Sequence, residues 1–226
     1  MSADNNARPR SGVVQAVLGD DSRSAAVIEC AAALAQAQQR VLSLVYVEST
    51  LAWQAAALPA ALALAHLGAA WSPFAPEDVE RGWRAQSARL RALAGTIALR
   101  HAVAWSLHTV RGELPRVAVE LSDATDLLLV AAGAALRPLG WRAGAGAVTW
   151  LRDEGNDAAA LGQRAASNLA QALRVPLRVL TAAPGDDAAF DALLRSARAA
   201  ETWVLPRGRA TPRRLAGMPC AVLLVG

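Results

Sequence analysis

Three charged side chains that follow predicted strands are the candidates for chemistry in this sequence. Asp153 follows the predicted strand 147–151, and Arg207 and Arg209 follow the predicted strand 202–205. The loops after the strands of a doubly wound sheet face ligands; a carboxylate there can hydrogen-bond ribose hydroxyls, and guanidinium groups can bind a phosphate. These residues therefore predict a candidate nucleotide site. The favoured alternative for Asp153 is a turn acid that caps the following helix.

Other reactive groups are either absent or isolated. All 23 basic residues are arginine, so Schiff-base chemistry and a lysine-bearing phosphate loop are excluded. Cys30 and Cys220 lie among small or apolar neighbours, which predicts buried thiols without a disulfide or a zinc site. His101 and His108 have no acidic or cysteine partner at a useful spacing. We therefore expect no metal and no enzymatic activity.

The charge distribution favours a mixed, solvated surface. The net charge is +4, but the arginines are spread along the chain among 19 acidic residues. We therefore expect that the protein does not bind nucleic acid. The polar segment 1–11 precedes the first apolar run and has no secretory signal pattern, so it is expected to be a disordered tail on a cytoplasmic protein.

Alternating apolar runs and amphipathic stretches predict a doubly wound α/β fold with parallel strands and two unequal halves. The first half covers 12–132, a Gly-rich linker covers 133–146, and a shorter second half covers 147–226. The predicted strands are 13–18, 41–47, 102–110, 126–131, 147–151, 176–181, 202–205 and 221–225. Between them lie predicted helices, among them 157–173, 187–200 and one that begins at Pro76. Whether the halves share one sheet or form two packed sheets stays open.

An uncharged insertion at 51–76 interrupts the first half. Its length raises the question of a membrane span, but much of it is alanine, and polar residues and a proline interrupt it. We therefore expect no membrane contact and predict a packed helical insertion that serves a homodimer or another protein partner. The candidate surface residues are Trp53, Leu62, His66 and Trp71.

The order of six segments resembles the universal stress protein family. The segments are VVQAVLGDDSRSAAVIECAAALA, VLSLVYVES, VRGELPRVAVELSDATDLLLVA, LRVLTAA, TWVLPRG and MPCAVLLVG. The resemblance implies a Rossmann-like parallel sheet, of the kind that adenine nucleotide alpha hydrolases share, with ATP or AMP at the carboxyl ends of its strands. It also places Asp153 at the family's nucleoside-binding aspartate in the second half.

The family's nucleotide motif is incomplete in this sequence. Leu18 occupies the position of the family's aspartate in the first half, and the glycines of 133–146 lack the spacing of its phosphate loop. The resemblance thus implies a tandem, degenerate module. We predict a non-enzymatic regulatory or stress-response protein that acts through protein contacts or dimerisation, without a cofactor. The alternative is an ATP or AMP sensor with one site in the second half.

Overall fold

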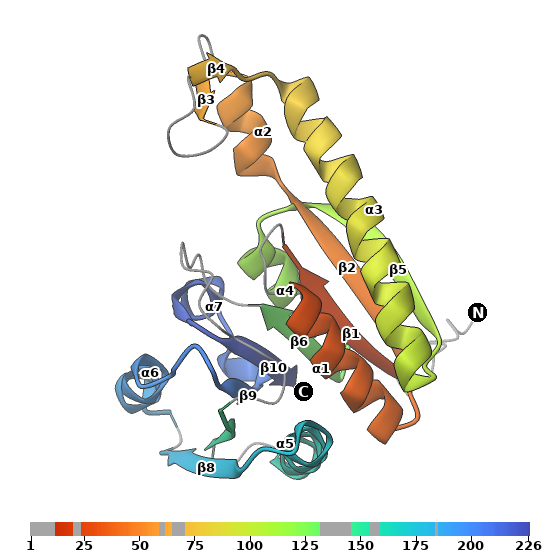
Figure 1. Ribbon diagram of the computed structural model, residues 1–226. Helices are drawn as coiled ribbons and strands as arrows, with labels where there is room; N and C mark the ends of the chain where they lie inside the picture. Colours follow the sequence, from red (N-terminus) through yellow and green to blue (C-terminus); the bar gives the residue numbers. More distant parts are fainter. Residues whose placement is uncertain are drawn as a thin grey trace, which may run out of the picture.

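A single eight-stranded sheet with helices on both faces forms the body of the protein (Figure 1). The computed structural model describes residues 12–19, 24–58, 62–64, 71–131, 146–153, 159–183 and 185–226. The strand order is β5-β2-β1-β6-β10-β9-β7-β8. Their bounds are Trp105–Gly112 (β5), Val41–Ser49 (β2), Val13–Leu18 (β1), Leu127–Ala131 (β6), Ala221–Val225 (β10), Thr202–Pro206 (β9), Val148–Asp153 (β7) and Leu177–Ala182 (β8). The predicted α/β class is confirmed, and the two sets of strands share one sheet.

The sheet consists of two parallel sets that run in opposite directions. β1, β2, β5 and β6 form the first set, and β7, β8, β9 and β10 form the second. They meet where β6 pairs antiparallel with β10, with Leu129 opposite Leu223. The carboxyl ends of the two sets therefore lie at opposite edges of the sheet. The predicted tail at 1–11 and nearly all of the predicted linker fall outside the described residues, and the division at 133–146 stays a prediction.

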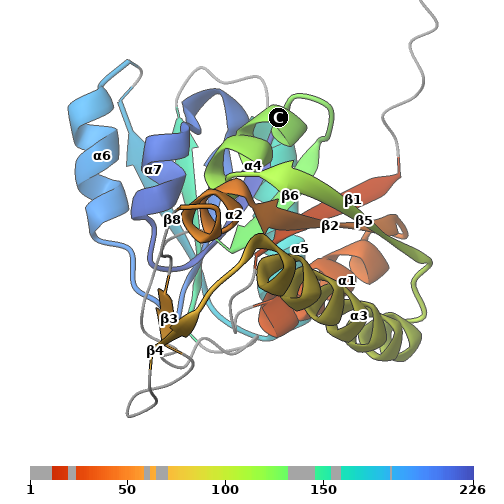
Figure 2. The same cartoon turned by 90° about the horizontal axis from the view of Figure 1, so that it is seen from above.

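Helices cover both faces of the sheet, which is why its central strands are apolar throughout. α1 (Ser24–Ala37) and α5 (Ala159–Leu173) lie on one face, and α4 (Leu114–Ser122), α6 (Asp187–Arg195) and α7 (Pro212–Gly217) lie on the other (Figure 2). Every residue of β6 and β10 is buried. Strands that are covered on both faces cannot alternate apolar and polar residues, so they read as continuous apolar runs.

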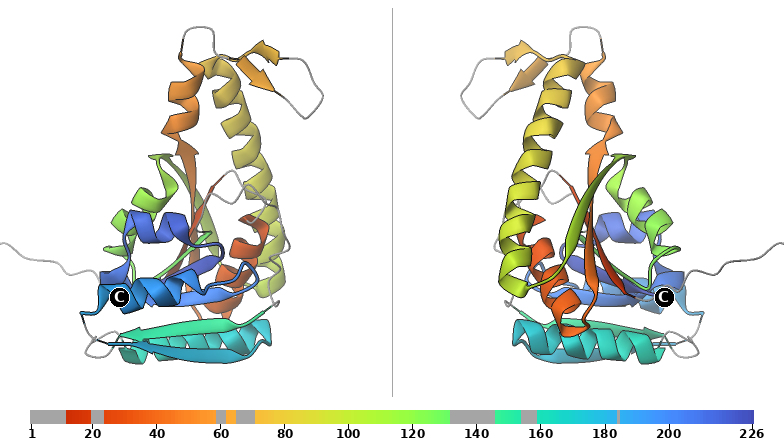
Figure 3. Two further views of the ribbon diagram at one scale, coloured as in Figure 1. Left: turned by 90° about the vertical axis from the view of Figure 1, so that its left-hand side faces the viewer. Right: turned by 90° about the vertical axis from the view of Figure 1, so that its right-hand side faces the viewer.

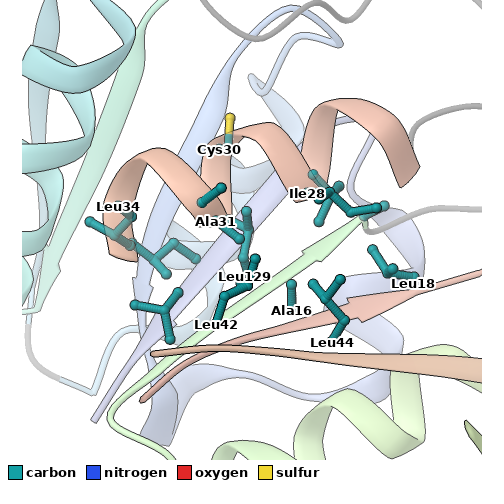
Figure 4. Close-up of a cluster of buried hydrophobic side chains, with 14 of the residues drawn as sticks. Ala16, Leu18, Ile28, Cys30, Ala31, Leu34, Leu42, Leu44 and Leu129 are labelled. Carbon is teal, nitrogen blue, oxygen red and sulfur yellow. The ribbon is translucent and has the colours of Figure 1, made fainter. Parts of the chain in front are cut away.

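The larger of the two core clusters lies on the face of the sheet that α1 and α5 cover. Ile28, Ala31 and Leu34 of α1 meet strand residues such as Leu44 and Leu129 (Figure 4). The two cysteines are fully buried, as predicted. Burial raises the pKa of the Cys30 thiol, so this side chain stays neutral and acts as a small apolar residue.

The insertion forms an arm that extends beyond the carboxyl edge of the first set (Figures 1 and 3). The arm comprises α2 (Thr50–Ala56), the antiparallel pair β3 (Leu62–Leu64) and β4 (Trp71–Pro73), and the first turns of α3 (Pro76–His101). The prediction of an entirely helical insertion is therefore wrong, because a strand pair follows a helix of two turns. The helix that was predicted to begin at Pro76 is confirmed.

Several element boundaries differ from the predicted ones for local reasons. β5 begins at Trp105 because α3 continues to His101 and ends in a left-handed Ala102. The predicted helix 187–200 ends at Arg195. The short helices η1 (Arg207–Arg209) and α7 were not predicted; Thr211 caps α7 by accepting from the Arg214 backbone amide, and Pro212 occupies its first turn.

The described residues contain neither a candidate membrane span nor a candidate metal cluster. In those ranges no helix combines the length and apolar character of a membrane span. Within the same ranges, His, Cys, Asp and Glu side chains do not gather in threes as a metal centre would require.

Candidate functional site

Asp153 and Arg209, two of the three predicted site residues, lie together at the carboxyl edge of the second set. Asp153 is the last residue of β7, and Arg209 lies in η1, which directly follows β9. Because β7 and β9 are adjacent parallel strands, their ends bring these side chains together. Arg209 Nε lies 3.5 Å from Asp153 Oδ2, and each side chain is only 13% exposed. The arrangement is a largely buried ion pair.

Arg209 has several further contacts around this pair. Its Nη2 donates to the Asp186 carbonyl oxygen at 3.2 Å, and its Nη1 lies 3.6 Å from Asp187 Oδ1. Its guanidinium carbon lies 4.6 Å from the ring centre of Phe190, which is fully buried. A guanidinium over an aromatic face gains a cation–π attraction. Arg209 is thus held between the end of β7 and the start of α6.

Arg207 is directed elsewhere. Its Nη1 donates to the Ser122 carbonyl oxygen at 2.8 Å, at the carboxyl end of α4. Cations are favoured at a helix carboxyl end, where backbone carbonyl groups lack partners. Arg207 therefore joins the second set of strands to a helix of the first half, and the structure does not bring it to Asp153.

Little free space surrounds Asp153 in the described part of the protein. The hollow beside it has a volume of about 10 Å³ and is lined by residues including Trp150, Gly162 and Leu205. That is about the size of one water molecule. Among the described residues, Asp153 Oδ1 and Arg209 Nε are both buried and have no hydrogen-bond partner. Two unsatisfied polar atoms in one place are unusual, because nearly all buried polar groups in proteins are paired.

The corresponding edge of the first set is closed by apolar contacts. Leu18, the last residue of β1, is fully buried. A Cβ added to Gly19 would lie 2.9 Å from Leu114 Cδ1, so α4 comes close to the backbone at the end of β1. Ser24 Oγ donates to the Gly19 carbonyl oxygen at 3.0 Å. These described residues present no carboxylate at the end of β1.

The arm exposes large apolar side chains on and beside α2. Leu51 is 60% exposed, Trp53 40% and Leu58 64%. Only Ala56 of this helix is buried. Single exposed apolar residues are ordinary, but three within eight positions on one projection mark a candidate contact surface. We call Leu51, Trp53 and Leu58 the arm surface.

The other predicted arm residues are only partly described. Leu62 and Trp71 lie in β3 and β4, whose backbones are described while their side chains are not. His66 lies outside the described residues. Of the four predicted surface residues, Trp53 alone has a described side chain, so a surface formed by all four stays a prediction.

Polar contacts fix the base of the arm to the sheet. Glu113 Oε1 accepts from Thr50 Oγ1 at 2.9 Å and from the Leu51 amide at 3.1 Å, at the start of α2. Arg111 lies 3.0 Å from Glu48 Oε2 and 5.3 Å from the ring centre of Trp83. Both anchors come from the end of β5 and its following turn. The arm is therefore held by contacts on both of its helices.

Sequence reasoning missed the partners that surround these residues. Asp187 and Phe190 approach Arg209 from α6, because Asp187 starts that helix and Phe190 lies one turn later. The sequence signal for these partners was the acidic residue at the start of the predicted helix 187–200, followed one turn later by an aromatic residue. Glu29 of α1 lies 2.8 Å from His101 Nε2, an acidic partner that is 72 residues away in the sequence and that no sequence spacing indicated. The pair joins α1 to the end of α3.

Several solved structures that resemble this chain belong to one protein family. Three solved structures to which this chain is similar are universal stress proteins. This is the family that the sequence motifs resemble. No family model and no curated protein matches the sequence.

Three of these universal stress protein structures give the extent of the likeness. One from Burkholderia pseudomallei is 16% identical, with a TM-score of 0.34, covering 77% of this chain and 99% of that one. One from Archaeoglobus fulgidus DSM 4304 is 8% identical, with a TM-score of 0.39, covering 93% of this chain and 95% of that one. A third, in complex with cAMP, is 12% identical, with a TM-score of 0.30 and coverage of 76% and 98%. These sequence identities and TM-scores are too low to transfer a function to this chain, so its function has to be inferred from its own residues.

Proposed function

We propose that this protein is a non-enzymatic regulatory module, similar to universal stress proteins, that acts through protein contacts of its arm. A second copy of the chain is the first expected partner. The observation that carries the proposal is the arm surface, where Leu51, Trp53 and Leu58 are 40–64% exposed on an element that extends beyond the sheet. Burying such side chains against a partner removes apolar area from water, which favours association.

The base of the arm supports this role. A projecting element that is already fixed to the sheet binds a partner more tightly than a mobile one, because ordering a mobile element on binding costs conformational entropy. Glu113 caps α2, and Arg111 holds Glu48 beside Trp83. The surface is therefore presented at a set position before any partner arrives.

The sheet edges support a role without nucleotide turnover. Leu18 and Leu114 close the end of β1, and Arg209 pairs with Asp153 beside a hollow of about 10 Å³. A nucleotide needs a pocket of about 300 Å³ or more. Contact through the arm needs no such pocket.

Light scattering of the purified protein tests the contact. The wild-type chain of 23.5 kDa is expected to run as a dimer, and the double variant Trp53→Glu/Leu58→Glu as a monomer, because two carboxylates would have to be buried at the interface. The matched control is Val179→Glu on the edge strand β8, where the native side chain is 51% exposed. It is expected to stay dimeric.

Two outcomes would contradict assembly through the arm. One is a dimer whose mass is unchanged in the Trp53→Glu/Leu58→Glu variant. The other is a dimer that Val179→Glu dissociates, since that result would move the interface to the edge of the sheet. Both variants change exposed side chains, so loss of fold does not confound the comparison.

An ATP or AMP sensor with a site at Asp153 is the second candidate function. The observation that favours it is the pair of unsatisfied buried atoms, Asp153 Oδ1 and Arg209 Nε. A ribose hydroxyl can donate to a carboxylate and accept from a guanidinium, so one such group would satisfy both. Arg209 would have to move from Asp153 to admit the sugar, and its guanidinium would then be available to a phosphate.

A thermal-shift titration with ATP, AMP and ADP tests the sensor. A ligand that binds the folded state raises the melting temperature, and a concentration about 100 times Kd adds about 2.7 kcal/mol of stability. The sensor predicts a rise for at least one nucleotide that Asp153→Ala abolishes. A melting temperature that no nucleotide changes would remove this candidate.

A further inference from the structure

A hollow between α6 and α7 lies apart from the arm surface and next to the Asp153–Arg209 pair, whose neighbour Asp187 is part of its lining. Its volume is about 510 Å³, within the range of small-ligand pockets. The two helices lie side by side on one face of the second set (Figures 1 and 2). Its inner wall includes Leu194 and Met218, which are nearly fully buried. The hollow thus has an apolar floor and a mouth lined by charged side chains.

One arginine forms hydrogen bonds with both carboxylates of the hollow. Arg214 Nε donates to Asp191 Oδ1, and its Nη2 donates to Asp187 Oδ1, each at 2.7 Å. Its Nη1 donates to the Arg209 carbonyl oxygen at 3.0 Å. The hydrogen bond from Arg214 lowers the pKa of the Asp187 carboxyl below its usual value, so this partner is ionised at neutral pH. Both acidic groups of the wall are therefore already paired.

Two other arginines of the wall keep their charge without a carboxylate partner. Residues 187, 191 and 195 recur every fourth position and share one face of α6, so Asp191 would be the ordinary helical partner of Arg195. In the structure, the Asp191 carboxylate instead accepts a hydrogen bond from Arg214. Arg213 lies on the facing helix. Within the described parts of the chain, neither Arg195 nor Arg213 forms an ion pair or a side-chain hydrogen bond.

The charge balance of the lining favours an anion. Three arginines face two aspartates around the hollow, which leaves a surplus of one positive charge, and Arg195 and Arg213 are both exposed. Guanidinium groups bind phosphate oxygens through paired N–H donors. Thr211 accepts from the Arg214 amide, which leaves its hydroxyl proton free to donate. The floor of Leu194 and Met218 fits an apolar group attached to the phosphate.

We propose that the hollow between α6 and α7 binds a small organic phosphate through Arg195 and Arg213, with its apolar part against Leu194 and Met218. Neither the arm surface nor Asp153 lines the site. Binding would place a ligand on the outer face of the second set and leave the edges of the sheet unchanged.

Titration of the full chain with phenyl phosphate, followed by the nuclear magnetic resonance shifts of the backbone amides, tests the site. We expect saturable shifts along α6 and α7. Phenol, which has the ring without the charge, is expected to cause none of them. The variant Arg195→Gln/Arg213→Gln should weaken binding about 100-fold, because each of the two lost charged hydrogen bonds contributes about tenfold. Arg91→Gln, an exposed arginine on α3, is the matched control and should bind as the wild type.

Three results would overturn the proposal. The first is an absence of saturable shifts in α6 and α7. The second is an affinity that the Arg195→Gln/Arg213→Gln variant leaves unchanged. The third is an equal loss in Arg91→Gln, which would mean attraction to the overall positive charge and no built site. An amide spectrum of the double variant that overlays the wild type away from α6 and α7 confirms that the fold is retained.

Discussion

Replacing Leu223 with alanine is expected to lower the free energy of unfolding by about 2–5 kcal/mol, the usual cost of a cavity in a packed core. Leu223 is fully buried in β10 and lies opposite Leu129 of β6. This pairing is the antiparallel contact through which the two sets of strands join. Chemical denaturation monitored by circular dichroism measures the loss.

The control for Leu223 is Leu99→Ala, at a side chain that is 84% exposed near the end of α3. This variant should stay within about 0.5 kcal/mol of the wild type, as surface substitutions usually do. Because Leu223 lies between the sets, its loss should also destabilise both of them in a single transition. A Leu223→Ala protein as stable as Leu99→Ala would mean that the β6–β10 junction does not hold the sheet together.

Replacing Glu201 with alanine is expected to cost about 2–3 kcal/mol, because it leaves a buried donor without a partner. Glu201 is 6% exposed, and its Oε2 accepts from Trp203 Nε1 at 2.8 Å and from the Arg198 amide at 3.2 Å. Trp203 is itself buried in the core, so water cannot replace the lost acceptor.

The companion variant Arg178→Ala separates charge from hydrogen bonding at Glu201. Arg178 Nη1 lies 3.0 Å from Glu201 Oε1, but its side chain is 56% exposed, so this ion pair should contribute at most about 1 kcal/mol. Equilibrium denaturation of both variants gives the comparison. If Arg178→Ala were as unstable as Glu201→Ala, the ion pair would be the dominant interaction, and the assigned role of the indole would be wrong.

Most elements of the sheet could be predicted because its central strands are buried on both faces. The run LLLVA is entirely apolar and VLSLVYV is mostly so, and β6 and β2 form there. The helix from Pro76 could be predicted because proline and acidic residues mark its start. Such signals lie within a few neighbouring residues, so one sequence is enough to detect them.

The direction of the second set and the shape of the arm could not be predicted in this way. The antiparallel β6–β10 pairing joins segments far apart in the chain, and apolar runs carry no mark of the partner strand. Alanine favours helices, so the insertion gave a helical pattern; its short strands β3 and β4 depend on pairing with each other.

The candidate site could be predicted in part. Asp153 and Arg209 follow neighbouring strands, and the rule that strand ends gather ligand-facing residues brought them together. Their direct pairing depends on how η1 turns after Pro206, and the path of Arg207 depends on α4, which lies far away in the sequence. Side-chain partners of this kind follow from tertiary packing.

The antiparallel pairing of β6 with β10 also determines where proteins fused to the two ends of the sheet would lie. Gln15 of β1 pairs with Leu128 of β6, and Leu128 pairs with Leu224 of β10, so the first and last strands are two strand spacings apart, about 10 Å. Because β10 runs opposite to β1, the start of β1 and the end of β10 lie at the same edge, where the Gly226 amide donates to the Asp126 carbonyl oxygen. Proteins fused ahead of β1 and after β10 would leave the sheet side by side.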